Sequence, residues 1–151
     1  MPASSKKIKK YVYVKHTADI EFFAFGNTPS GLFRNSVLAL FNVIADTKMV
    51  SSKRSAVRSI NLTASSYSLE DLLWKILQRS LSHTDADKLF GYAVRAMVVK
   101  KRGKKYEAHG VILCKDSSPE ASMLDVKGIS KYDMRISSMR GILKASAVLD
   151  V

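Results

Sequence analysis

The spacing of apolar residues changes along this chain, and that change constrains the fold more than any other feature of the sequence. Residues 28–46 and 68–83 carry apolar side chains at helical spacing, whereas the stretches around them favour strands. The second half contains no further helical stripe, so the strand–helix alternation of a doubly wound parallel sheet is absent. The sequence therefore predicts an α+β fold with two helices packed on mainly antiparallel sheets.

Both helical stretches begin with residues typical of helix caps. Thr28 precedes Pro29, as expected for an N-cap followed by proline in the first turn. Ser68 is followed three residues later by Asp71, which resembles a capping box. Polar residues 49–53 are expected to form a loop.

The remaining apolar stretches are short and are separated by polar residues, as expected for strands. A lysine-rich turn around Gly103 indicates a hairpin between two of them, and residues 116–120 indicate a loop. We see no repeat or linker that would divide the chain, so we expect a basic, flexible arm over residues 1–10 and one domain over residues 11–151. The expected strands cover residues 11–16, 21–25, 54–64, 90–98, 106–115, 123–129, 132–136 and 142–149.

The chain is strongly basic, with 25 lysines and arginines against 13 acidic residues and a formal net charge of +12. This charge favours an anionic partner, most plausibly nucleic acid or a protein bound to it. The alternative is that the lysines only solvate an end and a loop tip of the chain, and both interpretations stay open. The clustered cations are Lys6, Lys7, Lys9 and Lys10 in the arm, and Lys100, Lys101, Arg102, Lys104 and Lys105 in the turn.

Several functional classes find no support in the sequence. Cys114 is the only cysteine, which excludes an internal disulfide and a cysteine-rich zinc site, and its apolar surroundings predict a buried side chain. The three histidines have no metal-ligand spacing, and no catalytic serine, phosphate-binding or dinucleotide-binding motif is present. No stretch has the length of a membrane helix and no signal peptide is evident, so we expect a soluble, cytoplasmic protein without membrane contact.

Two aspartates lie in apolar surroundings. Asp19 follows the first expected strand, and Asp150 follows the apolar run that ends the chain next to the terminal carboxylate of Val151. If the last strand is docked, Asp150 and the terminal carboxylate enter partly buried space. Close carboxylates repel unless a hard divalent cation, or Lys127 or an arginine, joins them. The pattern alone favours simpler roles, with Asp19 as a turn residue and Asp150 in a solvated tail.

Residues 13–20, 126–130 and 148–151 form three blocks that together resemble the archease family, in the family's order and over nearly the whole chain. The first, residues 13–20, contains His-Thr-Ala-Asp and resembles the family's N-terminal HTAD signature. The second, residues 126–130, resembles the family's VKA[VI]T segment, and the third, residues 148–151, resembles its C-terminal end.

The resemblance implies a single α+β domain and a non-catalytic function. Archeases promote the guanylylation by GTP of an RtcB-type RNA ligase in tRNA splicing, and so allow it multiple turnovers. The resemblance also implies a divalent metal site, assigned to calcium, with side-chain ligands from Asp19 and Asp150 and a backbone or terminal oxygen from Val151. It places Lys127 and His16 near the contact with the ligase, although Lys127 has the alternative role of neutralising the acidic cluster.

This sequence departs from the family at two places. Ser130, Lys131 and Tyr132 stand where relatives often have threonine, tyrosine and histidine, and Gly128 replaces an alanine. The second helix is basic over residues 74–79, where relatives are acidic. Direct contact with tRNA is one hypothesis, and the main alternative function is a basic RNA-binding module or chaperone acting on tRNA. A metal-dependent hydrolase using the two aspartates is a third and weaker candidate, because no nucleophile or base is evident.

Overall fold

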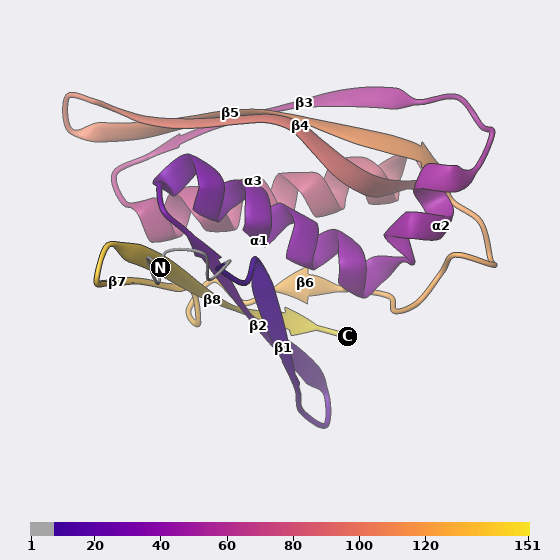
Figure 1. The fold of residues 1–151 in the computed structure, drawn as a ribbon, viewed down its shortest axis with the longest axis horizontal. Helices are drawn as coiled ribbons and strands as arrows, with labels where there is room; N and C mark the ends of the chain where they lie inside the picture. The colour runs from indigo at the N-terminus through magenta and orange to yellow at the C-terminus, as the bar shows by residue number, and fades with distance from the viewer. Residues whose placement is uncertain (1–7) are drawn as a thin grey trace, which may run out of the picture.

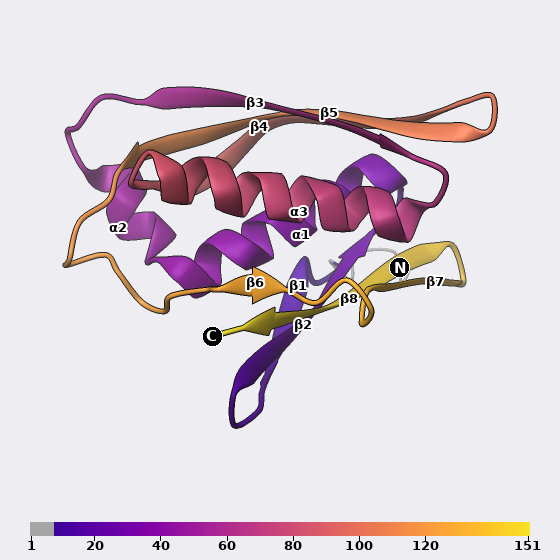
Figure 2. The same cartoon turned by 180° about the vertical axis from the view of Figure 1, so that it is seen from behind.

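Two antiparallel sheets enclose a layer of helices in the computed structural model, which describes residues 8–151 (Figure 1). The smaller sheet forms one outer layer, helices α1 (Pro29–Ile44) and α3 (Leu69–Ala86) form the middle, and the larger sheet forms the other outer layer. The view from behind shows the same three layers with α3 in front (Figure 2). Lys6 and Lys7 of the expected arm lie outside the described residues, and the division into arm and domain stays a prediction.

The larger sheet is built around the last strand of the chain. Its order is β1-β2-β8-β6, and β7 also pairs with β8, so β8 has three neighbours. All of these pairs are antiparallel. The strands are β1 (Tyr11–Lys15), β2 (Asp19–Gly26), β6 (Gly128–Ile129), β7 (Arg135–Met139) and β8 (Ile142–Asp150).

The smaller sheet has the order β3-β5-β4 and is also antiparallel. Its strands are β3 (Arg58–Ser66), β4 (Leu89–Arg102) and β5 (Lys105–Asp116). As expected, β4 and β5 form a hairpin that turns at Gly103, which has a φ of 61°. No helix in the described part of the chain is long and apolar enough to cross a membrane.

The position of α1 between the two sheets explains its composition. A helix covered on both sides is apolar around most of its surface, and α1 buries eight of its side chains. Its Phe41 ring packs directly against Gly91 of β4, where a Cβ atom would overlap the ring. Helix α3 instead buries a single stripe that includes Leu72, Ile76 and Leu77.

The predicted helix caps are found, with one difference. The Thr28 side chain accepts a hydrogen bond from the Gly31 amide, and the Ser68 side chain accepts one from the Asp71 amide, both at 3.1 Å. The return bond of a capping box is not made, because the Asp71 carboxylate accepts a hydrogen bond of 2.6 Å from the Ser66 hydroxyl instead.

The α+β class and the antiparallel sheets are confirmed, but the structure corrects some elements. A third helix, α2 (Thr47–Ser52), occupies the expected loop, with Asp46 as its N-cap. The strand expected at 54–64 begins only at Arg58.

The strand expected at 123–129 pairs only at its end. The chain must cross there from β5 in one sheet to β6 in the other, so its backbone bonds to the α1–α2 connection instead of to a strand ladder. The Met123 amide donates to the carbonyl of Ile44, and the Asp46 amide donates to the carbonyl of Ala121. Strand β7 begins at Arg135, three residues later than expected, because residues 131–133 form a turn and the Met134 amide donates to the carbonyl of Lys131.

Candidate functional site

The two aspartates singled out in the sequence lie side by side on the larger sheet. Asp19 is the first residue of β2 and not part of the β1–β2 connection, which corrects its expected place. It is directly opposite Asp150 in the antiparallel pair β2–β8. Opposite residues in such a pair have Cβ atoms about 4.5–5.5 Å apart and point to the same side of the sheet.

The side in question is the outer one, which no helix covers (Figure 1). The neighbours Ile20 and Leu149 are buried against the helices, so the alternation along each strand turns Asp19 and Asp150 outward. Asp19 is half-buried and Asp150 is exposed. The local pattern of strand residues therefore produces a pair of carboxylates facing solvent.

The last two residues are held by backbone hydrogen bonds, so the tail is docked and not frayed. The carbonyl of Asp150 accepts a hydrogen bond of 2.8 Å from the Lys127 amide, and the Val151 amide donates one of 3.5 Å to Ala18. The Val151 side chain is half-buried against the hydrophobic core. This docking keeps Val151 beside the aspartate pair.

The site is open on the side of β6. Gly128 of β6 lies opposite Asp150 on the side away from Asp19, and a Cβ atom placed there would meet nothing within 4 Å. Lys127 precedes it with an exposed side chain. Within residues 8–151, no ion pair joins Lys127 to Asp19, Asp150 or the C-terminus.

A carboxylate that the sequence analysis missed lies next to this pair. Glu21 is two residues after Asp19 in β2, so it points to the same outer side, which is the signal that could have found it. One of its oxygens lies 3.7 Å from Nε2 of His16, and the other accepts a hydrogen bond of 3.1 Å from the hydroxyl of Ser146. The structure thus brings His16 to the edge of the site through Glu21.

The donors of this site are oxygen atoms, which suits a hard cation such as calcium. Two side-chain carboxylates lie beside Val151 there, and within residues 8–151 Asp19 and Asp150 form no ion pair that would balance their charge. The described residues contain no group of three or more His, Cys, Asp or Glu side chains that could hold a metal. A bound cation would therefore depend on Val151 and water for its remaining ligands.

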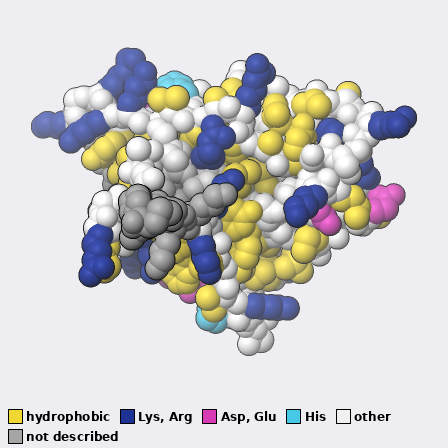
Figure 3. Space-filling model, viewed as in Figure 1, with side chains coloured by type: hydrophobic (Ala, Val, Ile, Leu, Met, Phe, Trp, Pro, Cys, Tyr) yellow, Lys and Arg dark blue, Asp and Glu magenta, His cyan; other side chains and the backbone are white. Residues whose placement is uncertain are grey.

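The basic turn lies far from the carboxylates. It forms the tip of the β4–β5 hairpin, which is at the opposite end of the molecule from the C-terminus in both views (Figures 1 and 2). Figure 3 shows lysine and arginine side chains gathered over this tip. Internal contacts engage three of these cations: Lys101 and Lys105 lie over the rings of Tyr106 and Tyr67, and Arg102 pairs with Glu107 at 3.3 Å.

The departures from the family pattern connect β6 to α3. Lys131 lies 3.5 Å from the Asp71 carboxylate and 5.1 Å from the centre of the Trp74 ring. The indole N–H of Trp74 donates a hydrogen bond of 2.9 Å to the carbonyl of Ile129. These contacts fix the segment that carries Lys127. Tyr132, which also departs from the family pattern, is 89% exposed.

Cys114 and Asp71, which lie outside the site, have perturbed pKa values. Burial raises the pKa of the Cys114 thiol to about 12, so the thiol is an inert core group as the sequence indicated. The hydrogen bond from Ser66, followed by the charges of Lys75 and Lys131, lowers the pKa of Asp71.

Comparison with known proteins identifies what this chain is similar to. The model of the Archease protein family (MTH1598/TM1083) matches residues 11–151. A protein archease of Methanosarcina acetivorans is 32% identical over 145 residues, which cover 95% of this chain and 97% of that protein.

Two solved structures have the same fold. The solution structure of Methanobacterium thermoautotrophicum protein 1598 aligns with a TM-score of 0.80 and 24% identity, covering 95% of this chain and 100% of that one. The crystal structure of a Thermotoga maritima archease, described as a possible chaperone, aligns with a TM-score of 0.59 and 13% identity, covering 91% and 94%.

Proposed function

The chain belongs to the archease family, and on that premise we propose that it is a non-catalytic activator of an RtcB-type RNA ligase in tRNA splicing. It would act in the cytoplasm by promoting guanylylation of the ligase by GTP, which lets one ligase molecule join many pairs of tRNA halves. The ligase performs the chemistry, and this protein makes contact with it.

The observation that carries the proposal is the pairing of Asp19 with Asp150 beside the docked C-terminus. Like charges held this close destabilise the fold unless a cation joins them. Asp19 and Asp150 would bind calcium through side-chain oxygens, and Val151 through a backbone or terminal oxygen. When bound, calcium would neutralise the pair and fix the end of β8 against β2.

Lys127 is the group we assign to contact with the ligase. Its backbone amide is fixed by the carbonyl of Asp150, and its side chain is exposed. An ammonium group placed in this way can bind a phosphate or a carboxylate of the partner. Because the Lys127 amide donates to the carbonyl of Asp150, binding of the cation by Asp150 would also fix the position of Lys127.

The test is multiple-turnover joining of tRNA halves by the cognate ligase, with calcium present and this protein at a low ratio to ligase. We expect wild-type protein to raise the number of joined products per ligase molecule. Asp19→Ala and Lys127→Ala should each abolish most of this gain, while Lys48→Ala on α2 should not. Equal stimulation by the wild-type and Asp19→Ala proteins would argue against a functional carboxylate site.

A basic RNA-binding module or chaperone acting on tRNA is the second candidate, and the cations at the hairpin tip favour it. Its signature would be tRNA binding that weakens steeply with salt and survives both chelation and Asp19→Ala. Such binding without any effect on a competent ligase would replace the activator proposal.

A further inference from the structure

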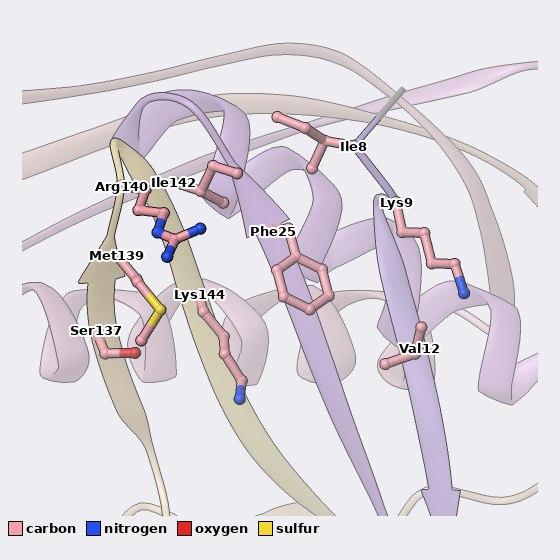
Figure 4. Close-up of a pocket in the computed structure, with 9 residues that line it drawn as sticks. All are labelled: Ile8, Lys9, Val12, Phe25, Ser137, Met139, Arg140, Ile142 and Lys144. Carbon is pink, nitrogen blue, oxygen red and sulfur yellow. The ribbon is translucent and has the colours of Figure 1, made fainter. Parts of the chain in front are cut away.

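The outer face of the larger sheet contains an apolar groove at the end opposite the carboxylate pair (Figure 4). It has a volume of about 640 Å³ and crosses β1, β2, β8 and β7. The Phe25 ring lies in its middle, between Val12 of β1 and the strand that carries Lys144 (Figure 4). A cavity of this size accommodates a few large side chains or one small ligand.

The walls of the groove are aliphatic and adaptable. Ile8, Val12, Ile142 and Met139 surround the Phe25 ring. Met139 is 75% exposed. Its long, flexible side chain is of a kind that proteins use on adaptable binding surfaces. An exposed apolar patch with this composition is typical of an interaction site.

The polar rim of the groove carries one sign of charge. Lys9, Arg140 and Lys144 border it, and no acidic side chain is among the described residues that line it. The Lys144 ammonium group lies 4.5 Å from the centre of the Phe23 ring, next to the groove on the same face. This rim selects a partner in which apolar groups are flanked by negative charge.

The composition of the groove favours a protein segment over other occupants. Nucleic-acid bases stack on aromatic platforms, but Phe25 is the only aromatic residue among the described residues that line the groove. The chain's own arm, with Lys6 and Lys7, and the same groove of a second copy would both bring positive charge to a positive rim.

The groove and the carboxylate pair share one surface. Phe25 is six residues from Asp19 along β2, which corresponds to about 20 Å, and Phe23 and Val148 lie between them on the outer face. A partner that contacts one end of this face is therefore within reach of the other.

We propose that this groove docks a short acidic segment of the partner protein, with one or two large apolar side chains inserted between flanking carboxylates. The identification of the partner as a protein rests on the proposed function, while the groove chemistry is read from its own residues. The docking segment would tether the partner so that its reactive region meets the carboxylate end.

The probe is a fluorescein-labelled peptide with a Leu-Phe pair between runs of aspartate and glutamate, measured by fluorescence anisotropy against the full chain. Two matched peptides serve as controls: one with lysines in place of the acids, and one with serines in place of Leu-Phe. We expect saturable binding of the acidic peptide alone, weakened by salt.

Two groove variants and two matched variants locate the binding. Arg140→Glu and Met139→Asp should each weaken the peptide about tenfold or more. Lys104→Glu makes the same charge change at the hairpin tip, and Met123→Asp changes a methionine that is 58% exposed; neither should matter. Unchanged thermal unfolding of the groove variants would show that binding, and not folding, was altered.

Three results would overturn the proposal: no peptide binding, equal weakening by groove and control variants, or displacement of the peptide from the groove by oligouridylate. A dimer that dissociates on Met139→Asp would assign the groove to a second copy instead. The peptide assay contains no ligase. A cognate ligase that does not respond to the protein would therefore contradict the proposed function and leave the peptide result unchanged.

Discussion

At the scale of single residues, two acidic side chains illustrate opposite environments. Asp71 is surrounded by groups that stabilise its charge, with the Ser66 hydroxyl at 2.6 Å and Lys75 at 3.3 Å. Asp150 instead faces another carboxylate, that of Asp19. The first arrangement stabilises the fold by itself, whereas the second places two like charges opposite each other.

Calcium should stabilise the wild-type protein through this second arrangement. At about 100 times its dissociation constant, a ligand that binds only the folded state adds about 2.7 kcal/mol, which raises the Tm of a domain of this size by about 5–10 °C. Asp150→Asn should remove the calcium shift without lowering the Tm measured in chelator, because it also removes a repulsion. Differential scanning fluorimetry tests this, with the exposed Asp85→Asn as control. A wild-type Tm that is indifferent to calcium would contradict the metal site.

The lowered pKa of Asp71 predicts that the stability of the protein depends on pH. Its pKa in the folded protein is lowered, so its contribution is fully present above the unfolded pKa of about 3.9 and is lost as pH falls through the lower, folded pKa. Asp71→Asn should cost about 1–3 kcal/mol at neutral pH, and this difference from wild type should shrink in acid. Urea unfolding at neutral and acidic pH measures it. An equal difference at both pH values would show that the charge is not involved.

At the scale of elements, much of the fold could be predicted because local patterns decide it. The caps at Thr28 and Ser68, the helical stripes and the β4–β5 turn depend on neighbouring residues alone. The helix α2 was missed because it is only six residues long and too short to show a helical apolar stripe, so its only strong signal is the N-cap Asp46. The strand expected at 123–129 was wrong because the crossing between sheets, a tertiary requirement, overrides its apolar pattern.

The candidate site shows the same limit. The sequence indicated Asp19, Asp150 and Val151 separately, but their juxtaposition depends on the register of β2 against β8, which no local pattern determines. Glu21 was missed although its period-two relation to Asp19 was available. The groove around Phe25 could not be predicted, since it joins residues from four strands.

Packing between elements gives a prediction at Gly91. A methyl group there would overlap the ring of Phe41 in α1, so Gly91→Ala should destabilise the protein by about 1–3 kcal/mol. Gly128→Ala is the matched control, because its Cβ atom would meet open space. Chemical denaturation measures both. Equal stability of the two variants would show that α1 and β4 are less closely packed than described.

At the scale of the whole molecule, the three layers separate the charged features. The carboxylate pair and the groove lie on the larger sheet, and the exposed basic tip belongs to the smaller one. The proposed contacts with a ligase and any contacts with RNA can therefore be altered independently by substitution.

This separation predicts the effect of removing charge at the hairpin tip. The salt dependence of any tRNA binding is the slope of log affinity against log salt concentration. Replacing Lys100, Lys104 and Lys105 by alanine should reduce this slope by at most about three. Stimulation of the ligase should persist. Nitrocellulose filter binding over a salt series measures the first effect, and loss of ligase stimulation would show that the tip acts in activation.

The measurement that tests the central claim most directly is guanylylation of the cognate RtcB-type ligase by labelled GTP, with this protein at substoichiometric amounts. We predict that each molecule of the protein supports guanylylation of more than one ligase molecule, and that Asp150→Asn loses this effect at a calcium concentration where the wild type works. A competent ligase that is guanylylated equally fast and equally often without the protein would contradict the account.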